Sequence, residues 1–357
     1  ASGSLASGPG EPVLEGRLAW SGVQWPLVGA GPEFSSPEGQ LELAGATDAY
    51  EFSLAAALAG SQIPAGNWQG RGRGDLSGME LQELRGELLD GSLLASGPLG
   101  WDPYPSWSLQ IEASDINPGS WMPDLPGRLK LVMASTGQLA ADEIATELEL
   151  HELSGELMEY AFQATASAAL AGDELELRSL SLNSDGNQLQ VQGQLSPQQL
   201  ALDWQLRGSN PGALLPGAGG QLSGYGSVQG SPEQPAVKVS IEGRELGFDG
   251  LSAPVLDIEL LAGTGAEDPL RLDLALGPVQ EGGQILLEAA TVKIRGTNSK
   301  HRLALDLQSL PAKLQLIMQG GLGPNLVIWS GYLEQLGAAT ADYGSWQLER
   351  AAALLRA

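Results

Sequence analysis

Residues 187–212 alternate between apolar and polar side chains, and this alternation limits the possible folds of the chain more than any other feature. Leu189, Val191 and Leu195 fall on one side of a strand, and the alternation resumes after Ser196-Pro197 from Leu200 to Leu206. A period of two gives a β-strand one apolar and one polar face, and a short proline turn between two such strands indicates a hairpin. The hairpin therefore predicts a sheet whose apolar face must be covered by something else.

Similar alternation continues along most of the chain and predicts an all-β fold. We count roughly two dozen strand candidates at the spacing of about 8–14 residues that is typical of all-β chains. Glycine supplies 49 of the 357 residues, about twice its usual share of ~7%, as expected for many strands and turns. Only Leu348–Leu355 combines residues of high helix propensity, and this stretch is equally compatible with a strand. The sequence thus predicts no layer of helices to cover the apolar faces.

Composition argues against several classes of function. Cysteine is absent, which excludes disulfides, thiolate metal sites and a cysteine nucleophile. The net charge of −25 would repel nucleic acid and an anionic membrane surface. His151 and His301 are the only histidines and lack the spacing of metal ligands, so we expect both to be surface strand residues. We predict no catalytic residue, no metal site and no cofactor, and therefore a protein that is not an enzyme.

The chain is organised as a short lead-in followed by one long repetitive region. Residues 1–12 are rich in Ser, Gly and Pro and are expected to be flexible, whereas residues 13–357 are expected to form one continuous segment. No run of about 18 apolar residues is present. The repeating pattern is under way at both ends, which suggests an interior piece of a longer chain. Residues 81–119 and 177–212 form a loose repeat, in which strands alternate with an Asp-Gly turn, a Pro turn and a final Asn-Pro-Gly.

Several stretches, taken in order, carry a resemblance to a known family. They are GRLAWSGVQWPL at 16–27 with SPEGQLELAG at 36–45, GSLLASGPLGWDPYPSWSLQIEASDINPG at 91–119, GQLSGYGSVQGSPEQPAVKVSIEGRELGFDGL at 220–251, and IWSGYLEQL at 328–336 with YGSWQLERAAALL at 343–355. In this order they resemble the middle region of the TamB family, the translocation and assembly module subunits among the AsmA-like, bridge-type lipid transfer proteins of Gram-negative bacteria. The resemblance covers most of the chain, and residues 91–119 carry its strongest part.

The resemblance implies both a fold and a function. The fold would be an elongated, twisted, open β-sheet folded into a U-shaped apolar trough, a β-taco, built of repeated β-hairpin units with few or no helices. The function would be non-enzymatic transport of phospholipids across the periplasm between the inner and outer membranes, in support of outer-membrane assembly. The full-length protein would be anchored in the inner membrane and would partner an outer-membrane barrel of the TamA type, through parts outside this sequence.

On this interpretation the apolar strand faces line a groove that binds phospholipid acyl chains. Exposing a chain of about 16 CH₂ groups to water would cost about 12 kcal/mol, and a continuous apolar track would remove most of that barrier. An aliphatic lining suits a fluid ligand, whereas a selective pocket would need converging polar groups. The candidate lining residues are Phe52, Leu54, Leu109, Ile111, Leu189, Val191, Leu200, Leu202, Trp204, Leu206, Val237, Val239, Ile241, Leu270, Leu272, Leu274, Leu303, Leu305, Leu307, Leu314 and Leu316.

Two other functions remain open on the sequence. The chain could be a periplasmic scaffold or chaperone for outer-membrane proteins such as autotransporters, which would pair with exposed sheet edges. It could also be a closed β-solenoid stalk or adhesin, because apolar alternation is equally the ordinary core of a closed β-structure. Trp101, Trp107 and Trp204 are expected to be packing residues or residues at the edge of the groove.

Overall fold

The computed structural model describes residues 2–6, 13–26, 33–46, 48–61, 63–140, 143–213, 217–309, 312–323 and 328–354. These residues form β-strands, turns and two short 3-10 helices, η1 (Pro118–Ser120) and η2 (Pro211–Ala213), and they contain no α-helix. Of the two possibilities left open at 348–355, helix or strand, the described part contains the strand. Ala352–Leu354 forms strand β26, which pairs with β24 from Leu333↔Ala352 to Gly331↔Leu354. Pairing with a neighbouring strand has overridden helix propensity, which is only a weak preference.

The contacts divide the chain into two units, Ala1–Leu182 and Asn183–Ala357. Continuity of the whole region 13–357 stays a prediction. The strands that begin in the first unit are β1 (Ser2–Ala6), β2 (Val13–Trp25), β3 (Phe34–Ala46), β4 (Ala49–Gly60), β5 (Gly66–Gly74), β6 (Gly78–Leu88), β7 (Gly91–Gly100), β8 (Ser106–Ile116), β9 (Gly127–Ala140), β10 (Glu143–Leu157), β11 (Tyr160–Ala171) and β12 (Glu174–Ser184).

The second unit contains a comparable series of strands. They are β13 (Asn187–Leu195), β14 (Leu200–Gly208), β15 (Ala218–Ser231), β16 (Gln234–Phe248), β17 (Leu251–Gly263), β18 (Pro269–Gly277), β19 (Val279–Glu281), β20 (Gln284–Leu287), β21 (Ala289–Thr297), β22 (His301–Gln308), β23 (Ala312–Leu322), β24 (Trp329–Thr340), β25 (Gly344–Gln347) and β26 (Ala352–Leu354).

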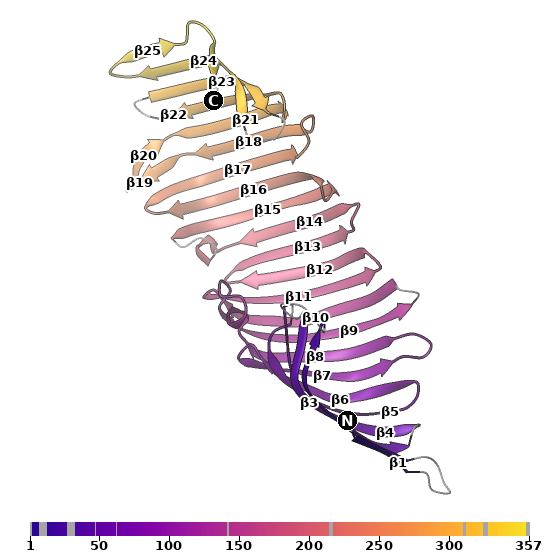
Figure 1. Cartoon of the computed structure of the whole chain (residues 1–357). Helices are drawn as coiled ribbons and strands as arrows, with labels where there is room; N and C mark the ends of the chain where they lie inside the picture. Colours follow the sequence, from indigo (N-terminus) through magenta and orange to yellow (C-terminus); the bar gives the residue numbers. More distant parts are fainter. Residues whose placement is uncertain are drawn as a thin grey trace. The chain divides into compact units, whose positions relative to one another are not determined.

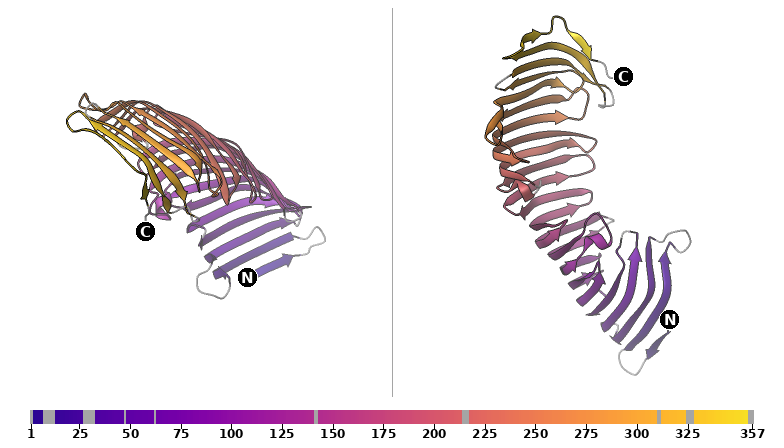
Figure 2. Two further views of the ribbon diagram at one scale, coloured as in Figure 1. Left: turned by 90° about the horizontal axis from the view of Figure 1, so that it is seen from above. Right: turned by 90° about the vertical axis from the view of Figure 1, so that its left-hand side faces the viewer.

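Within each unit, most strands pair antiparallel with the next strand along the chain, so each unit is largely a succession of hairpins (Figure 1). In the second unit the order is interrupted twice. Strand β18 pairs with β21 while β19, of the small hairpin β19–β20, pairs with β17, and β26 pairs with β24 instead of β25. The strands of both units are twisted and curved (Figure 2). No pairing among the described residues joins the first strand of a unit to its last, so both sheets are open.

This topology confirms the predicted all-β fold of repeated hairpins in an open, twisted sheet. It does not fit the alternative of a closed β-solenoid, because the strands meander antiparallel and never wind around a common core. The predicted flexible lead-in at residues 1–12 stays a prediction. Ser2–Ala6 forms β1 and pairs with β2 from Ser2↔Arg17 to Ala6↔Val13, whereas the other residues of 1–12 lie outside the described part.

The repeat found in the sequence produces the same contact in both units. In the first unit, Asn117 Nδ2 donates to Asp90 Oδ2 at 3.1 Å, which ties the Asn-Pro-Gly segment to the Asp-Gly turn. In the second unit, Asn210 Nδ2 donates to Asp185 Oδ2 in the same way. Each pair fixes the end of a third strand against the turn two strands earlier. The repeat is therefore a structural unit of three strands.

The polar faces of the sheets carry cross-strand ion pairs, including Arg71–Glu83 at 2.6 Å and Lys130–Glu152 at 2.8 Å. The Asp273 carboxylate forms ion pairs with two arginines. Arg271 lies 3.1 Å away, and Arg295 binds the other carboxylate oxygen. Hydrogen bonds lower the pKa of five carboxyl groups in the described chain, the largest contribution coming from the partner given in parentheses: Asp75 (Ser77), Asp90 (Ser120), Glu152 (Lys130), Asp273 (Arg295) and Asp306 (Gln315).

These lowered pKa values predict that the fold loses stability in acid. A carboxyl group whose pKa is lower in the folded than in the unfolded chain stabilises the fold above its unfolded pKa, which is about 4, and this contribution disappears as the pH falls through the folded pKa. We expect the urea midpoint to be constant near neutral pH and to fall below about pH 4. Asp273→Asn should make that fall shallower, and an unchanged acid dependence in this variant would contradict the assignment.

Candidate functional site

The predicted lining residues of the second unit share one face of its sheet. Partners in register lie on the same side of an antiparallel sheet, so the registers can be followed from strand to strand. Leu272 faces Leu260 on β17 and Ile294 on β21, and the pairings continue in both directions. We call this line the Trp204 row: Val191, Trp204, Gly226, Val239, Leu260, Leu272, Ile294, Leu303, Met318 and Leu333.

A second line of side chains runs beside the first, two residues further along each strand except where a bulge intervenes in β24. We call it the Leu206 row: Leu189, Leu206, Gly224, Ile241, Ile258, Leu274, Val292, Leu305, Leu316 and Leu336. The remaining predicted residues of this unit flank the two rows on the same face, and they are Leu200, Leu202, Val237, Leu270, Leu307 and Leu314. All seventeen candidates beyond residue 182 therefore belong to one apolar face, counted from the residues named here.

The four candidates of the first unit also share a face. Leu54 and Ile111 belong to one row across nine pairings: Leu18, Leu41, Leu54, Gly70, Leu84, Ala95, Ile111, Met133, Leu150 and Ala166. Phe52 lies two residues from Leu54 on β4, and Leu109 lies two residues from Ile111 on β8. The period of two places each of these neighbours on the same side of its strand.

The apolar faces are only half covered. Every candidate lining residue retains partial solvent exposure, and no large side chain in the described chain is fully buried. The exposed area of the protein is 21726 Å², whereas two compact domains sharing its mass would expose roughly 16,500 Å² together. The alternating residues are thus not the interior of a closed domain. They form open, half-exposed apolar surfaces.

Aromatic side chains fill the gaps that glycines leave in these faces. Trp204 lies across Gly226 and Gly224 on β15, where an added Cβ would come within 2.7 Å and 3.5 Å of its ring. In the first unit Phe52 covers Gly72 in the same manner, at 2.7 Å. An aromatic ring over a cross-strand glycine keeps the sheet surface closed where a side chain is missing. The rows therefore remain continuous through both glycine-rich strands.

Of the tryptophans predicted to be packing or edge residues, some pack on the apolar face and one lies at the end of the strands. Trp107 lies over Gly137 on the apolar face, and its Nε1 donates to Ser135 Oγ at 2.9 Å. Trp101 is exposed at the end of the strands, where its Nε1 donates to the carbonyl oxygen of Leu76 at 2.7 Å. Trp107 and Trp204 are thus packing residues, and Trp101 is an edge residue.

Removing the Trp204 ring should weaken the second unit. Trp204→Ala exposes the backbone of Gly224 and Gly226 and deletes half-buried apolar area, so we expect a loss of about 2 kcal/mol in the free energy of unfolding. Chemical denaturation measures this change. Trp346→Ala is the matched control, since Trp346 is 52% exposed on β25 and should contribute little. Equal losses in the two variants would mean that Trp204 does not pack over the glycines.

Sequence reasoning missed part of the same face. Leu256, Ile258 and Leu260 on β17 lie opposite Leu276, Leu274 and Leu272. The acidic residues between them did signal alternation, but apolar residues on the other face of β17, such as Leu261, concealed it. Val292 and Ile294 on β21 were missed because the strand offers only two large apolar positions.

His301 corrects a further expectation, since it is buried and not a surface residue. It is 6% exposed, its Nδ1 lies 2.9 Å from the carbonyl oxygen of Thr297, and its Nε2 accepts from Trp329 Nε1 at 2.9 Å. A neutral ring with its proton on Nδ1 satisfies both contacts. His151 is exposed, as expected. In the part of the chain that the structure describes, no group of three potential metal ligands occurs and no helix is suited to cross a membrane.

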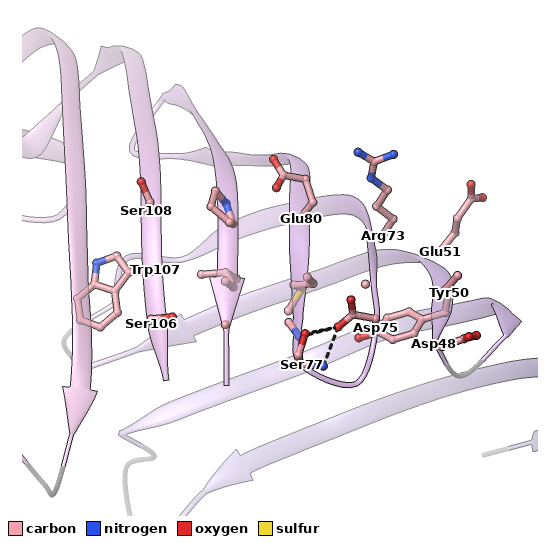
Figure 3. A pocket seen from close by; sticks show the side chains of 17 residues that line it. Asp48, Tyr50, Glu51, Arg73, Asp75, Ser77, Glu80, Ser106, Trp107 and Ser108 are labelled. Carbon is pink, nitrogen blue, oxygen red and sulfur yellow. Dashed lines mark hydrogen bonds between the residues drawn. The ribbon is translucent and has the colours of Figure 1, made fainter. Parts of the chain in front are cut away.

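A cavity of about 710 Å³ opens in the first unit where strands β4 to β8 meet their turns (Figure 3). Its apolar lining includes Tyr50, Met79, Leu99 and Trp107, and its polar lining includes Asp48 and Asp75. The Arg73-Gly74-Asp75 tripeptide ends β5, and Asp75 accepts hydrogen bonds from the turn that follows it. Nothing in the sequence pattern indicated this cavity, because its residues come from five separate strands.

Comparison with known proteins agrees with the geometry. The family model described as "TamB, N-terminal domain" matches residues 13–355. A translocation and assembly module subunit TamB from Haemophilus influenzae is 23% identical over 299 residues, which make up 83% of this chain and 23% of that protein. The chain therefore spans about a quarter of the length of this curated relative. Because the family model covers nearly all of the chain, the chain belongs to the TamB family.

Proposed function

We propose that this chain is part of a non-enzymatic conduit that carries phospholipids across the periplasm between the inner and outer membranes. The observation that carries the proposal is the unbroken, half-exposed apolar face, which passes from strand to strand through the Trp204 and Leu206 rows. Acyl chains would lie on this face while headgroups remain in water. The full-length protein would be anchored in the inner membrane.

The spacing of the rows supports movement along the sheet. Neighbouring strands lie about 4.8 Å apart, so each row offers an apolar side chain every ~5 Å. A tail that leaves one side chain meets the next before it is exposed to water, which avoids most of the ~0.8 kcal/mol cost for each CH₂ group. Leu, Val, Ile and Met dominate both rows, and such a surface does not fix one orientation of a ligand.

A second candidate is a scaffold for the assembly of outer-membrane proteins together with a barrel of the TamA type. The name of the relative, a translocation and assembly module subunit, favours this candidate. In this case the strands of unfolded client proteins would pair with exposed sheet edges, and these proteins, not lipids, would contact the apolar face. The two candidates differ in what touches a given side chain, so crosslinking can separate them.

The test places a photoreactive residue at Leu202 or Leu272 on the apolar face, and at Gln205 on the polar face as the control. Mass spectrometry then identifies the adducts formed in cells. The conduit predicts phospholipid adducts at both apolar positions and few at Gln205. Barrel proteins as the main adducts would support the scaffold, and the absence of lipid both from the adducts and from the purified chain would overturn the conduit.

A further inference from the structure

The cavity of the first unit lies where the apolar face reaches the end of the strands. Tyr50, Met79, Leu99 and Trp107 are linked by successive registers, with Gly74 standing between Tyr50 and Met79. These side chains therefore form one more row of the apolar face. A Cβ at Gly74 would come within 2.6 Å of the Tyr50 hydroxyl oxygen, so the tyrosine side chain reaches across this glycine. The cavity is thus lined by this apolar row on one side and by polar turns at the strand ends on the other.

Two carboxylates, Asp48 and Asp75, line the cavity beside the apolar row. Asp75 Oδ1 accepts hydrogen bonds from the Ser77 backbone N–H at 2.7 Å, the Ser77 hydroxyl at 2.6 Å and the Gly78 N–H at 3.1 Å. All three donors use the same oxygen, so within the described chain Oδ2 has no hydrogen-bond partner. The Ser77 hydroxyl also holds the pKa of Asp75 below its ordinary value. Asp48 is exposed and has no ion pair with any described residue.

Arg73 also lines the cavity, but it does not neutralise the charges of Asp48 and Asp75. Arg73 lies in register between Glu51 and Glu80, on the polar face of the sheet. Figure 3 shows Glu51, Arg73 and Glu80 on the opposite side of the strands from Asp48, Asp75 and Ser77. Among the residues that line the cavity, those on the apolar side of the sheet thus carry two negative charges and no positive charge.

We propose that this cavity binds the headgroup of a lipid that carries a primary ammonium, with Asp75 and Asp48 at the ammonium and an acyl chain on the row from Tyr50 to Trp107. This inference rests on the proposed function and adds a headgroup preference to it. The volume of about 710 Å³ falls within the range of roughly 300–1,000 Å³ usual for ligand sites. The free oxygen of Asp75 accepts an N–H, and the neighbouring Tyr50 ring attracts a cation. An anionic headgroup would be repelled by both carboxylates.

The test incubates the 357-residue chain with vesicles that contain phosphatidylethanolamine, phosphatidylglycerol and phosphatidylcholine in equal amounts. The lipids that remain with the purified protein are then quantified by mass spectrometry. We expect phosphatidylethanolamine to be enriched over both of the others. The double variant Asp48→Asn with Asp75→Asn should lower this enrichment by roughly two- to five-fold, as expected for exposed charge pairs, at unchanged total lipid.

The matched control is Asp203→Asn with Asp249→Asn, which changes the net charge equally at exposed positions of the second unit. This control should keep the full enrichment. Equal binding of the three lipids, or an enrichment that survives in the Asp48/Asp75 double variant, would overturn the headgroup inference while leaving the conduit intact. Failure of all three lipids to bind would overturn the conduit and the inference with it.

Discussion

Replacing Leu272 with arginine is expected to slow lipid transfer more than ten-fold while the protein remains folded. Leu272 stands in the Trp204 row between Leu260 and Ile294. A guanidinium at this point would have to be desolvated whenever an acyl chain passes over it, which costs several kcal/mol, whereas 1.4 kcal/mol already corresponds to a factor of ten. The measurement is fluorescent phospholipid transfer between vesicles, or lipid transport in cells if the isolated chain is inactive.

The control for this variant is Ala275→Arg on the same strand. Ala275 is exposed on the polar face, opposite Asp257 and Thr291, so the added charge is the same but it points away from the apolar face. Transfer should stay near that of the unchanged protein. If both variants transferred lipid equally well, or if both failed, the apolar face would not be the path. Circular dichroism of both proteins confirms that the sheet is retained.

Replacing Asn298 with aspartate should destabilise the second unit by about 3 kcal/mol or more. Asn298 is only 4% exposed, and its Nδ2 donates to the carbonyl oxygens of Gly263 at 2.7 Å and Gly265 at 2.8 Å. Aspartate has nearly the same shape but cannot donate. The change therefore leaves two carbonyl groups unsatisfied and places a negative charge beside them.

Urea denaturation at neutral pH measures this loss. Asn183→Asp serves as the control, because Asn183 is exposed in the same unit and the substitution adds the same charge. Its unfolding free energy should change by less than about 0.5 kcal/mol. A similar small effect at Asn298 would show that the turns at 263–268 and 297–300 do not depend on its amide.

The alternation of side chains predicted the candidate face because strand geometry is local. A residue and its second neighbour point to the same side of any strand, so Leu270, Leu272 and Leu274 share a face whatever surrounds them. The same argument failed wherever geometry depended on more than one strand. Leu256, Ile258 and Leu260 were missed because only their partners on β18 identify the apolar side of β17.

The burial of His301 and the structure of residues 348–354 were decided by contacts with other strands. His301 was expected at the surface, but Trp329 reaches it from another strand and completes its burial. Residues 348–354 had the composition of a helix, yet the edge of β24 recruits Ala352–Leu354 as a strand. In both cases a contact between distant parts of the sequence outweighed the local preference.

The sequence by itself determined that this protein is a series of β-hairpins with one apolar and one polar face, and that no helix would cover the apolar one. Both conclusions follow from a two-residue period that a strand converts directly into a surface. Only the tertiary structure decided how those surfaces join. The cross-strand registers align separate alternations into continuous rows, the rings of Phe52 and Trp204 close the gaps over glycines, and five strand ends create the cavity beside Asp75. These features depend on which residues of neighbouring strands lie opposite each other, and the sequence of a single strand does not specify that register.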